Sequence, residues 1–95
     1  MKMKIYEVRS EINTCVDSDE PYSTVDTELF LSKDKAIVYM REQALEYAKE
    51  LARYRYTTYH TVDSYPNDAE SIELNCCDDS DEYGLFNVTE REVNE

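Results

Sequence analysis

Hydrophobic and polar residues alternate at the start of the chain. In residues 3–12 the apolar side chains of Tyr6, Val8 and Ile12 fall on one face of an extended backbone. The opposite face carries Glu7, Arg9 and Glu11. A period of two is typical of a strand with one buried face. We therefore predict a strand over residues 3–12.

A second alternating stretch covers residues 22–31. The face that we expect to be buried holds Val25, Leu29 and Leu31. Asp26 and Glu28 alternate with them, and Phe30 breaks the pattern, as it would at a strand end covered on both sides. Because only a polar turn region separates this stretch from the first, the two are predicted to form an antiparallel hairpin.

The hydrophobic period changes to three and four residues after Ser32. Ser32 stands where a helix N-cap is expected, since its hydroxyl can accept a hydrogen bond from the first turn. From Lys33 to Tyr56 there is no Gly or Pro. One apolar stripe is formed by Ile37, Met40, Ala44, Ala48 and Leu51. The pattern predicts one long helix that buries this stripe.

Shorter patterns follow the helix. Thr57, Thr58, Thr61 and Val62 are β-branched, which favours a strand over residues 57–64, although a helix frayed as far as His60 is an alternative. Two further strands are expected, with these residues facing inward: Ile72, Leu74 and Cys76 in residues 71–77, and Phe86 and Val88 in residues 83–92.

These elements give the order β-β-α-(β)-β-β. An antiparallel sheet with the helix across one face buries the helix stripe and the one-sided strands together. We therefore predict a single two-layer α+β domain over residues 1–95, with four to five strands and one long helix.

The net charge of −12 narrows the choice of partners. Residues 57–95 hold eleven acidic side chains and one basic side chain, whereas residues 33–56 hold four acidic and six basic ones. Such an excess of negative charge repels nucleic acid and anionic lipid. We expect neither direct nucleic-acid binding nor membrane association.

Catalytic patterns are not found in the sequence. The chain has one histidine, His60, and no cysteine stands at a spacing that supports a Cys–His pair. With Gly84 as its single glycine, it cannot form a glycine-rich phosphate loop. We predict no enzymatic activity and no cofactor. The three cysteines, without a secretory signal, suggest reduced thiols in the cytoplasm.

The segment from Asp79 to Glu90 offers a calcium-binding alternative. Asp79, Asp81, Gly84 and Glu90 match positions one, three, six and twelve of a calcium loop. Helices flank such a loop, whereas strands are predicted here. We favour an acidic hairpin turn in which Gly84 supplies an unusual backbone angle, and no metal.

The same acidic part of the chain provides a candidate surface for a protein partner. Tyrosine is enriched at protein interfaces, and Tyr56 and Tyr59 belong to a cluster of tyrosines after the helix. Eight carboxylates, here called the acidic-segment carboxylates, accompany them: Asp63, Asp68, Glu70, Glu73, Asp78, Asp79, Asp81 and Glu82. Together these ten residues are predicted to bind a protein.

Closely spaced carboxylates can imitate nucleic-acid phosphates and so attract the basic groove of a nucleic-acid-binding protein. In composition, though not in any motif, the chain resembles small phage-borne inhibitors of host defence. That resemblance implies an interaction module of the anti-restriction or anti-CRISPR class, carried by a phage or another mobile element. The alternative is a structural or regulatory domain that forms a homodimer through a sheet edge or the exposed helix face.

Overall fold

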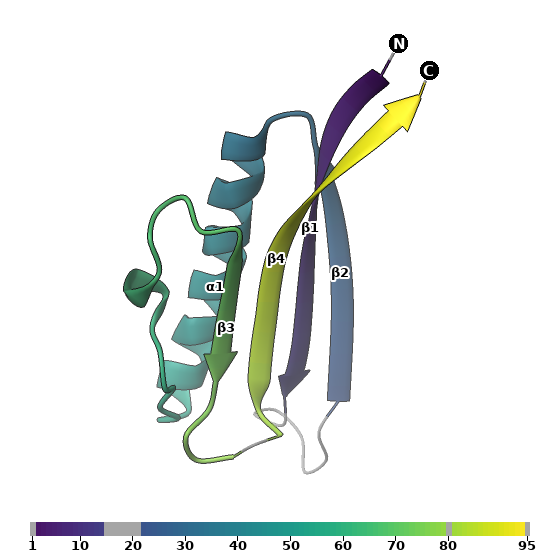
Figure 1. Ribbon diagram of the computed structural model, residues 1–95. Coiled ribbons are helices and arrows are strands. Elements are labelled where there is room, and N and C mark those ends of the chain that lie inside the picture. The colour runs from purple at the N-terminus through teal and green to yellow at the C-terminus, as the bar shows by residue number, and fades with distance from the viewer. Residues whose placement is uncertain (1, 15–21, 80, 95) are drawn as a thin grey trace.

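A computed structural model describes residues 2–14, 22–79 and 81–94 (Figure 1). It contains one four-stranded antiparallel sheet and one helix, α1 (Lys33–Arg53), which packs across one face. The strands are β1 (Lys2–Thr14), β2 (Tyr22–Phe30), β3 (Ser71–Asn75) and β4 (Tyr83–Asn94). The predicted α+β class is thus confirmed. Among the described residues, no helix is long and apolar enough to cross a membrane.

The strand order is β2-β1-β4-β3, so the first and last strands of the chain lie side by side at the centre. β1 pairs with β2 as the predicted hairpin, and it also pairs with β4 along its whole length. The chain ends therefore meet at one end of the sheet, where β1 and β4 run past the helix (Figure 1). β2 and β3 form the two edges.

α1 begins as the sequence predicts. The Ser32 hydroxyl accepts a hydrogen bond from the Lys35 backbone N–H (3.4 Å). The side chains that α1 buries are Ala36, Ile37, Met40, Ala44, Tyr47 and Leu51. The predicted stripe is correct except that Ala48 is only half-buried and Tyr47 is buried beside it.

α1 ends at Arg53, and neither prediction for the following segment is correct. The N–H groups of Arg55 and Tyr56 turn back to the carbonyls of Ala52 (3.0 Å) and Leu51 (2.9 Å). This pair of hydrogen bonds is a Schellman motif, which needs one residue in the left-handed helical conformation. Arg55 takes that conformation, with φ of 65°. Glycine usually fills this position, so the sequence shows no stop signal there.

Residues 57–64 form no strand. Thr58 makes a single bridge to Cys76, and Val62–Ser64 form a short 3-10 helix. The Thr61 N–H donates to the Ser64 hydroxyl (3.2 Å), and the Thr58 hydroxyl donates to the His60 carbonyl (2.6 Å). Such local side-chain bonds compete with a strand ladder. The β-branched residues therefore form a looped segment that covers the β3 side of the sheet.

The predicted inner face of β2 is the wrong one. Phe30 lies opposite Tyr6 and Glu28 lies opposite Val8, so the even-numbered residues of β2 share the helix side of the sheet. Val25 and Leu29 lie on the far face and are 49% and 59% exposed. Leu31, just beyond the strand, is also exposed.

The core lies between α1 and the other three strands. Val8 from β1, Ile72 and Leu74 from β3 and Phe86 from β4 are buried against the helix, as predicted. Among the strands, β2 has only its last residue packed against this core, since Phe30 contacts Tyr39 (5.1 Å between ring centroids). A single helix is too narrow to cover all four strands, so the helix side of β2 stays exposed except at Phe30.

Candidate interaction surfaces

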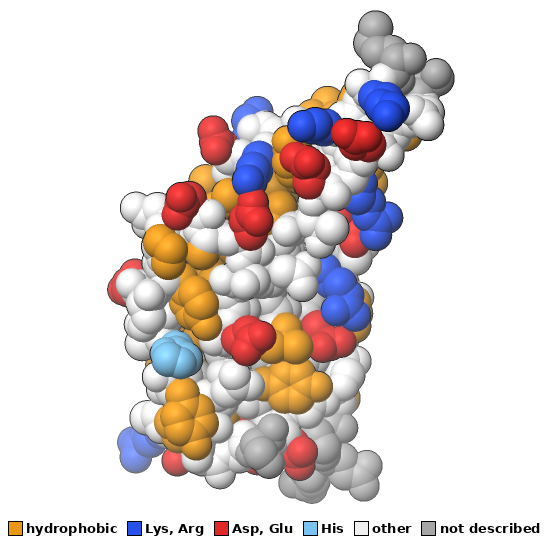
Figure 2. Space-filling view, in the orientation of Figure 1, with side chains coloured by type: hydrophobic (Ala, Val, Ile, Leu, Met, Phe, Trp, Pro, Cys, Tyr) orange, Lys and Arg blue, Asp and Glu red, His pale blue; other side chains and the backbone are white. Residues whose placement is uncertain are grey.

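The acidic-segment carboxylates do not form one continuous patch. Asp63 lies in the 3-10 helix, Asp68 in the turn after it, Glu73 on β3 and Asp81 in the turn before β4, and all four are exposed. Figure 2 shows acidic side chains spread over the face in view, with hydrophobic side chains between them and basic ones mostly toward the upper end. The negative charge of these carboxylates is therefore spread over a broad surface.

Four of these carboxylates have partners within the chain, namely Glu70, Asp78, Asp79 and Glu82, and Asp79 accepts a hydrogen bond from the Asp81 backbone N–H (2.9 Å). Glu70 forms an ion pair with Lys33, and the hydrogen bond and charge of Glu70 raise the pKa of the Lys33 amine. Asp78 accepts hydrogen bonds from the backbone N–H of Thr57 (2.9 Å) and from its hydroxyl (3.1 Å). These bonds, that from the N–H first, lower the pKa of Asp78. Asp78 thus fastens the segment after α1 to the end of β3.

Glu82 is not on the surface. Its side chain is fully buried and accepts hydrogen bonds from the hydroxyls of Tyr47 (2.6 Å) and Thr14 (2.9 Å). The bonds join three elements, because Tyr47 belongs to α1 and Thr14 ends β1. A buried polar group of this kind needs such partners. Glu82 is therefore a structural residue and is withdrawn from the predicted partner surface.

Gly84 has a steric role and not the conformational one that we predicted. The structure has no glycine with positive φ. A Cβ atom at position 84 would instead lie 2.7 Å from the ring of Tyr47 and 2.8 Å from that of Phe86. Glycine is needed there because the helix side chain packs onto the strand backbone.

The two tyrosines predicted to bind a partner are placed differently. Tyr59 is exposed, whereas Tyr56 is half-buried and packs against the core. A third tyrosine, Tyr65, has a role that sequence reasoning missed. Its hydroxyl donates to the Glu73 carbonyl (3.1 Å) and accepts from the Glu73 N–H (3.2 Å). It therefore occupies the outer edge of β3.

The calcium-loop positions do not converge. Glu90 lies along β4 opposite Tyr6, six residues beyond Gly84, or about 20 Å at strand spacing. Within the described part of the chain, no three carboxylate, histidine or cysteine side chains are grouped as metal ligands. The geometry therefore gives no support to the calcium-binding alternative.

Among the residues that the structure describes, histidine and cysteine are likewise not brought together in a catalytic arrangement. His60 is exposed and its ring meets the edge of Tyr65 (6.3 Å between centroids). Cys76 is buried and its sulfur accepts from the Asp78 N–H (3.3 Å), while Cys77 is exposed. Cys15 lies outside the described residues.

The structure also shows a groove that the sequence did not indicate. We call it the β2–α1 groove; it runs between the uncovered inner face of β2 and the adjacent side of the helix. Its middle is lined by Ser10, Asp26 and Glu28 from the sheet and by Tyr39 and Gln43 from α1. Toward the Tyr22 end it is lined by Thr24, Glu46 and Glu50, among others. Acidic side chains from distant parts of the sequence thus face one groove.

Most of the groove's acids lack basic neighbours. In the part of the chain that the structure describes, Glu50 pairs with Arg53 (3.3 Å), but Asp26, Glu28 and Glu46 form no ion pair. The sequence did not predict this groove, because its alternation placed Asp26 and Glu28 on the face of β2 turned away from the helix. The one indication of the correct face in the sequence was Phe30, because this apolar residue lies on the same face of β2 as Asp26 and Glu28.

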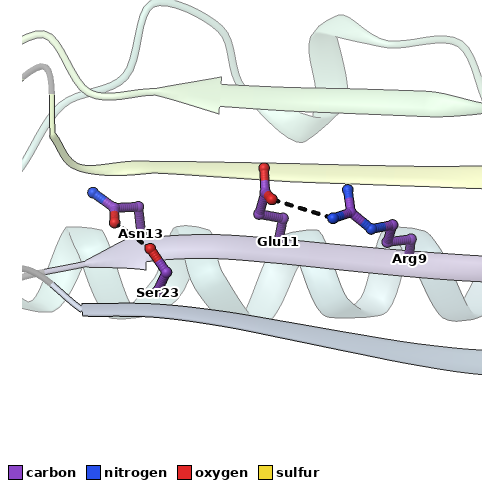
Figure 3. A network of polar contacts seen from close by, with 4 residues as sticks. All are labelled: Arg9, Glu11, Asn13 and Ser23. Carbon is purple, nitrogen blue, oxygen red and sulfur yellow. Dashed lines mark hydrogen bonds and ion pairs between the residues drawn. The ribbon is translucent and has the colours of Figure 1, made fainter.

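The far face of the sheet has better balanced charge. Arg9 pairs with Glu11 (3.3 Å), and the Asn13 side chain accepts a hydrogen bond from the Ser23 hydroxyl (2.6 Å) (Figure 3). All four side chains stand on the face turned away from α1 (Figure 3). Arg91 of β4 pairs with Glu7 in the same layer (3.1 Å). This face is therefore less suited to a basic partner than the groove.

Comparison with protein-family models, with curated proteins and with solved structures gives no match.

Proposed function

We propose that this protein is a non-enzymatic interaction module that binds a basic protein partner through its exposed carboxylates. The observation that carries the proposal is the set of exposed acids that have no basic partner among the described residues. They flank both edges of the sheet: Asp26, Glu28, Glu42 and Glu46 on one side, and Asp63, Asp68, Glu73 and Asp81 on the other. Unpaired carboxylates leave a negative field that attracts and orients a basic surface.

In the most specific form of this proposal, the partner is a nucleic-acid-binding protein, and the module inhibits that protein by occupying its basic groove. The net charge of −12 supports this form, as do the exposed acids that lack a basic partner among the described residues. The module itself contacts neither nucleic acid nor membrane. The proposed location is the cytoplasm, which agrees with the free thiols of Cys76 and Cys77.

Affinity capture followed by salt titration tests the proposal. The full chain is used to capture a partner from its native cell, and retention is measured as salt rises from about 0.05 M to about 0.3 M, where screening of exposed charges becomes strong. We expect retention to fall steeply with salt and duplex DNA or RNA to compete. A partner that is held equally well at high salt, with no competition, would disprove the proposal.

The second candidate is a homodimer. Exposed apolar side chains favour it, namely Val25 and Leu29 on the far face of the sheet and Val38 and Leu45 on the outer side of α1. Opposing it is the repulsion between two chains that each carry a charge of −12. Sedimentation at micromolar concentration distinguishes the two, since a monomer removes the dimer from consideration.

A further inference from the structure

β2 is an edge strand with an open outer side. It pairs with β1 on one side only, and none of the described residues pairs with the other side (Figure 1). In an antiparallel ladder every second residue of such a strand points its N–H and C=O away from its single neighbour. Edge strands are commonly protected by lysine, proline or a bulge. Residues 22–30 contain no lysine or proline, and the charges that point inward from this edge, those of Asp26 and Glu28, are both acidic, so a strand of opposite charge can pair there.

The opposite edge of the sheet is closed. The Tyr65 hydroxyl bonds to both backbone groups of Glu73, and Thr58 bridges to Cys76 at the end of β3. The looped segment after α1 therefore occupies the positions that an added strand would need. Of the two edge strands β2 and β3, β2 is therefore the one whose outer side is open to an extended peptide.

The two faces of β2 specify the chemistry of an added strand. On the helix side, Asp26 and Glu28 are exposed and have no basic partner in the described part of the chain. On the far side, Val25 and Leu29 are about half exposed. Directly opposed side chains on neighbouring strands interact, and opposite charges and apolar pairs both stabilise a sheet. The complementary strand has basic residues alternating with apolar ones.

An apolar hollow of about 340 Å³ adds a third requirement at the Phe30 end of the strand. Phe30, Val38 and Tyr39 form most of its apolar lining, where β2 meets the first turns of α1. Phe30 is on the same side of β2 as Glu28 and Asp26, two and four positions away. A bulky apolar residue placed opposite Phe30 would reach this hollow while the basic residues face the two acids.

We infer that β2 binds an extended basic segment of the partner protein as an added strand. The segment carries a bulky apolar residue, lysine or arginine two and four positions from it, and apolar residues at the positions opposite Val25 and Leu29. This inference rests on the proposed function and deepens it, since it names the surface that the basic partner occupies and the form that the partner takes there.

A second copy of the chain does not meet these requirements. Pairing two β2 strands about Thr27 would put each Asp26 opposite the Glu28 of the second copy, and pairing about Asp26 would oppose the two Asp26 carboxylates. Like charges directly opposite destabilise a sheet. Charged residues pointing inward from an edge are a known protection against self-pairing. The same two acids that disfavour a second copy in these two registers attract a basic strand.

The test uses the full chain and a synthetic peptide, Phe-Val-Lys-Thr-Lys-Val, together with its reversed sequence, because either strand direction is possible. Binding is followed by the backbone amide signals of the protein in NMR at low salt. One control peptide has the same composition with adjacent lysines, and another has N-methyl groups at alternate backbone nitrogens. The protein variants are Asp26→Lys/Glu28→Lys and, as a matched control of equal charge change, Asp63→Lys/Asp68→Lys.

We expect the largest amide shifts along residues 22–30. The β2 variant should bind about tenfold more weakly, whereas the Asp63/Asp68 variant should bind with little change. Both control peptides should bind more weakly than the alternating one. Unchanged amide signals of β4 in the β2 variant would show that its sheet is intact.

Three outcomes would overturn the inference. If the Asp63/Asp68 variant loses binding and the β2 variant keeps it, the basic peptide binds at the other edge of the sheet. The proposed function would then still hold. Equal binding of the N-methylated peptide would exclude strand addition. If the unsubstituted chain forms a dimer and the β2 variant is a monomer, the occupant of β2 is a second copy of the chain. If no basic peptide binds and capture also yields no salt-sensitive partner, the proposed function itself fails.

Discussion

The ring of Tyr47 packs against the backbone of Gly84, so that a Cβ atom at Gly84 would lie 2.7 Å from two of the ring carbons. Two residues earlier on the same strand side, Glu82 accepts the hydroxyl hydrogen bond of the same tyrosine (2.6 Å). One helix side chain is therefore held by a glycine that makes room for its ring and by a buried carboxylate that binds its end. This contact fixes how α1 lies on β4.

Gly84→Ala should destabilise the fold by about 1–3 kcal/mol, since the added methyl group has no space and the ring must move. The measurement is urea unfolding of the full chain. In a background that already carries Tyr47→Leu, the Gly84→Ala substitution should cost less than it does alone, because much of the clash is with the Tyr47 ring. If the effects of the two substitutions simply add, the close contact is not the cause.

Tyr47→Phe keeps the ring and removes only the hydroxyl that donates to Glu82. We expect a loss of about 1–3 kcal/mol in the free energy of unfolding, since a buried carboxylate loses one of its hydrogen bonds. Tyr39→Phe is the matched control. Tyr39 is half-buried on the same helix and has no hydroxyl bond among the described residues, so its substitution should change stability by less than about 0.5 kcal/mol.

Arg55→Gly should stabilise the protein by about 0.5–1 kcal/mol. Arg55 closes the helix with φ of 65°, a conformation that costs an L-residue free energy and a glycine almost none. Arg55→Ala keeps the strained conformation and should give no such gain. Thermal unfolding of the two variants compares them directly. An equal gain from both would point to loss of the arginine side chain instead.

The bond between Asp78 and Thr57 should break in acid. Because the hydrogen bonds lower the pKa of Asp78, they stabilise the fold above the usual aspartate pKa of about 3.9 and cease to do so as the pH falls through the lower, folded value. The Thr57 amide proton, which donates to this carboxylate, should report that titration in NMR. Its midpoint should lie below the usual aspartate pKa of about 3.9.

Asp78→Asn is the control for that titration. The Thr57 amide signal should then no longer move at acid pH, although the amide side chain can still accept a hydrogen bond. A Thr57 signal that titrates unchanged in the variant would mean that another group is responsible.

Local patterns were enough to predict the helix and the four strands that the sheet contains. The period of two in β1, the Ser32 cap and the three- and four-residue spacing in α1 depend on neighbours in sequence, and each agrees with the structure. The end of the helix was less predictable, since Arg55 occupies a position where glycine is the usual signal. The Thr-rich segment was misjudged because its hydroxyls bond locally.

The placement of charge was not predictable in the same way. Glu82 lies in an acidic run that looks exposed, and only the approach of Tyr47 and Thr14 from two other elements makes its burial possible. Likewise, the charges of the α1 residues seemed nearly balanced, yet the fold brings Glu46 beside the groove that Asp26 and Glu28 line.

The sequence by itself therefore determined the strands, the capped helix and its buried stripe, because hydrophobic periodicity and capping act over a few residues. Only the tertiary structure decided which face of β2 turns toward the helix. That choice follows from its register with β1 and from a helix too narrow to cover four strands. The same arrangement leaves β2 as an open edge, with two carboxylates on one side and two apolar residues on the other.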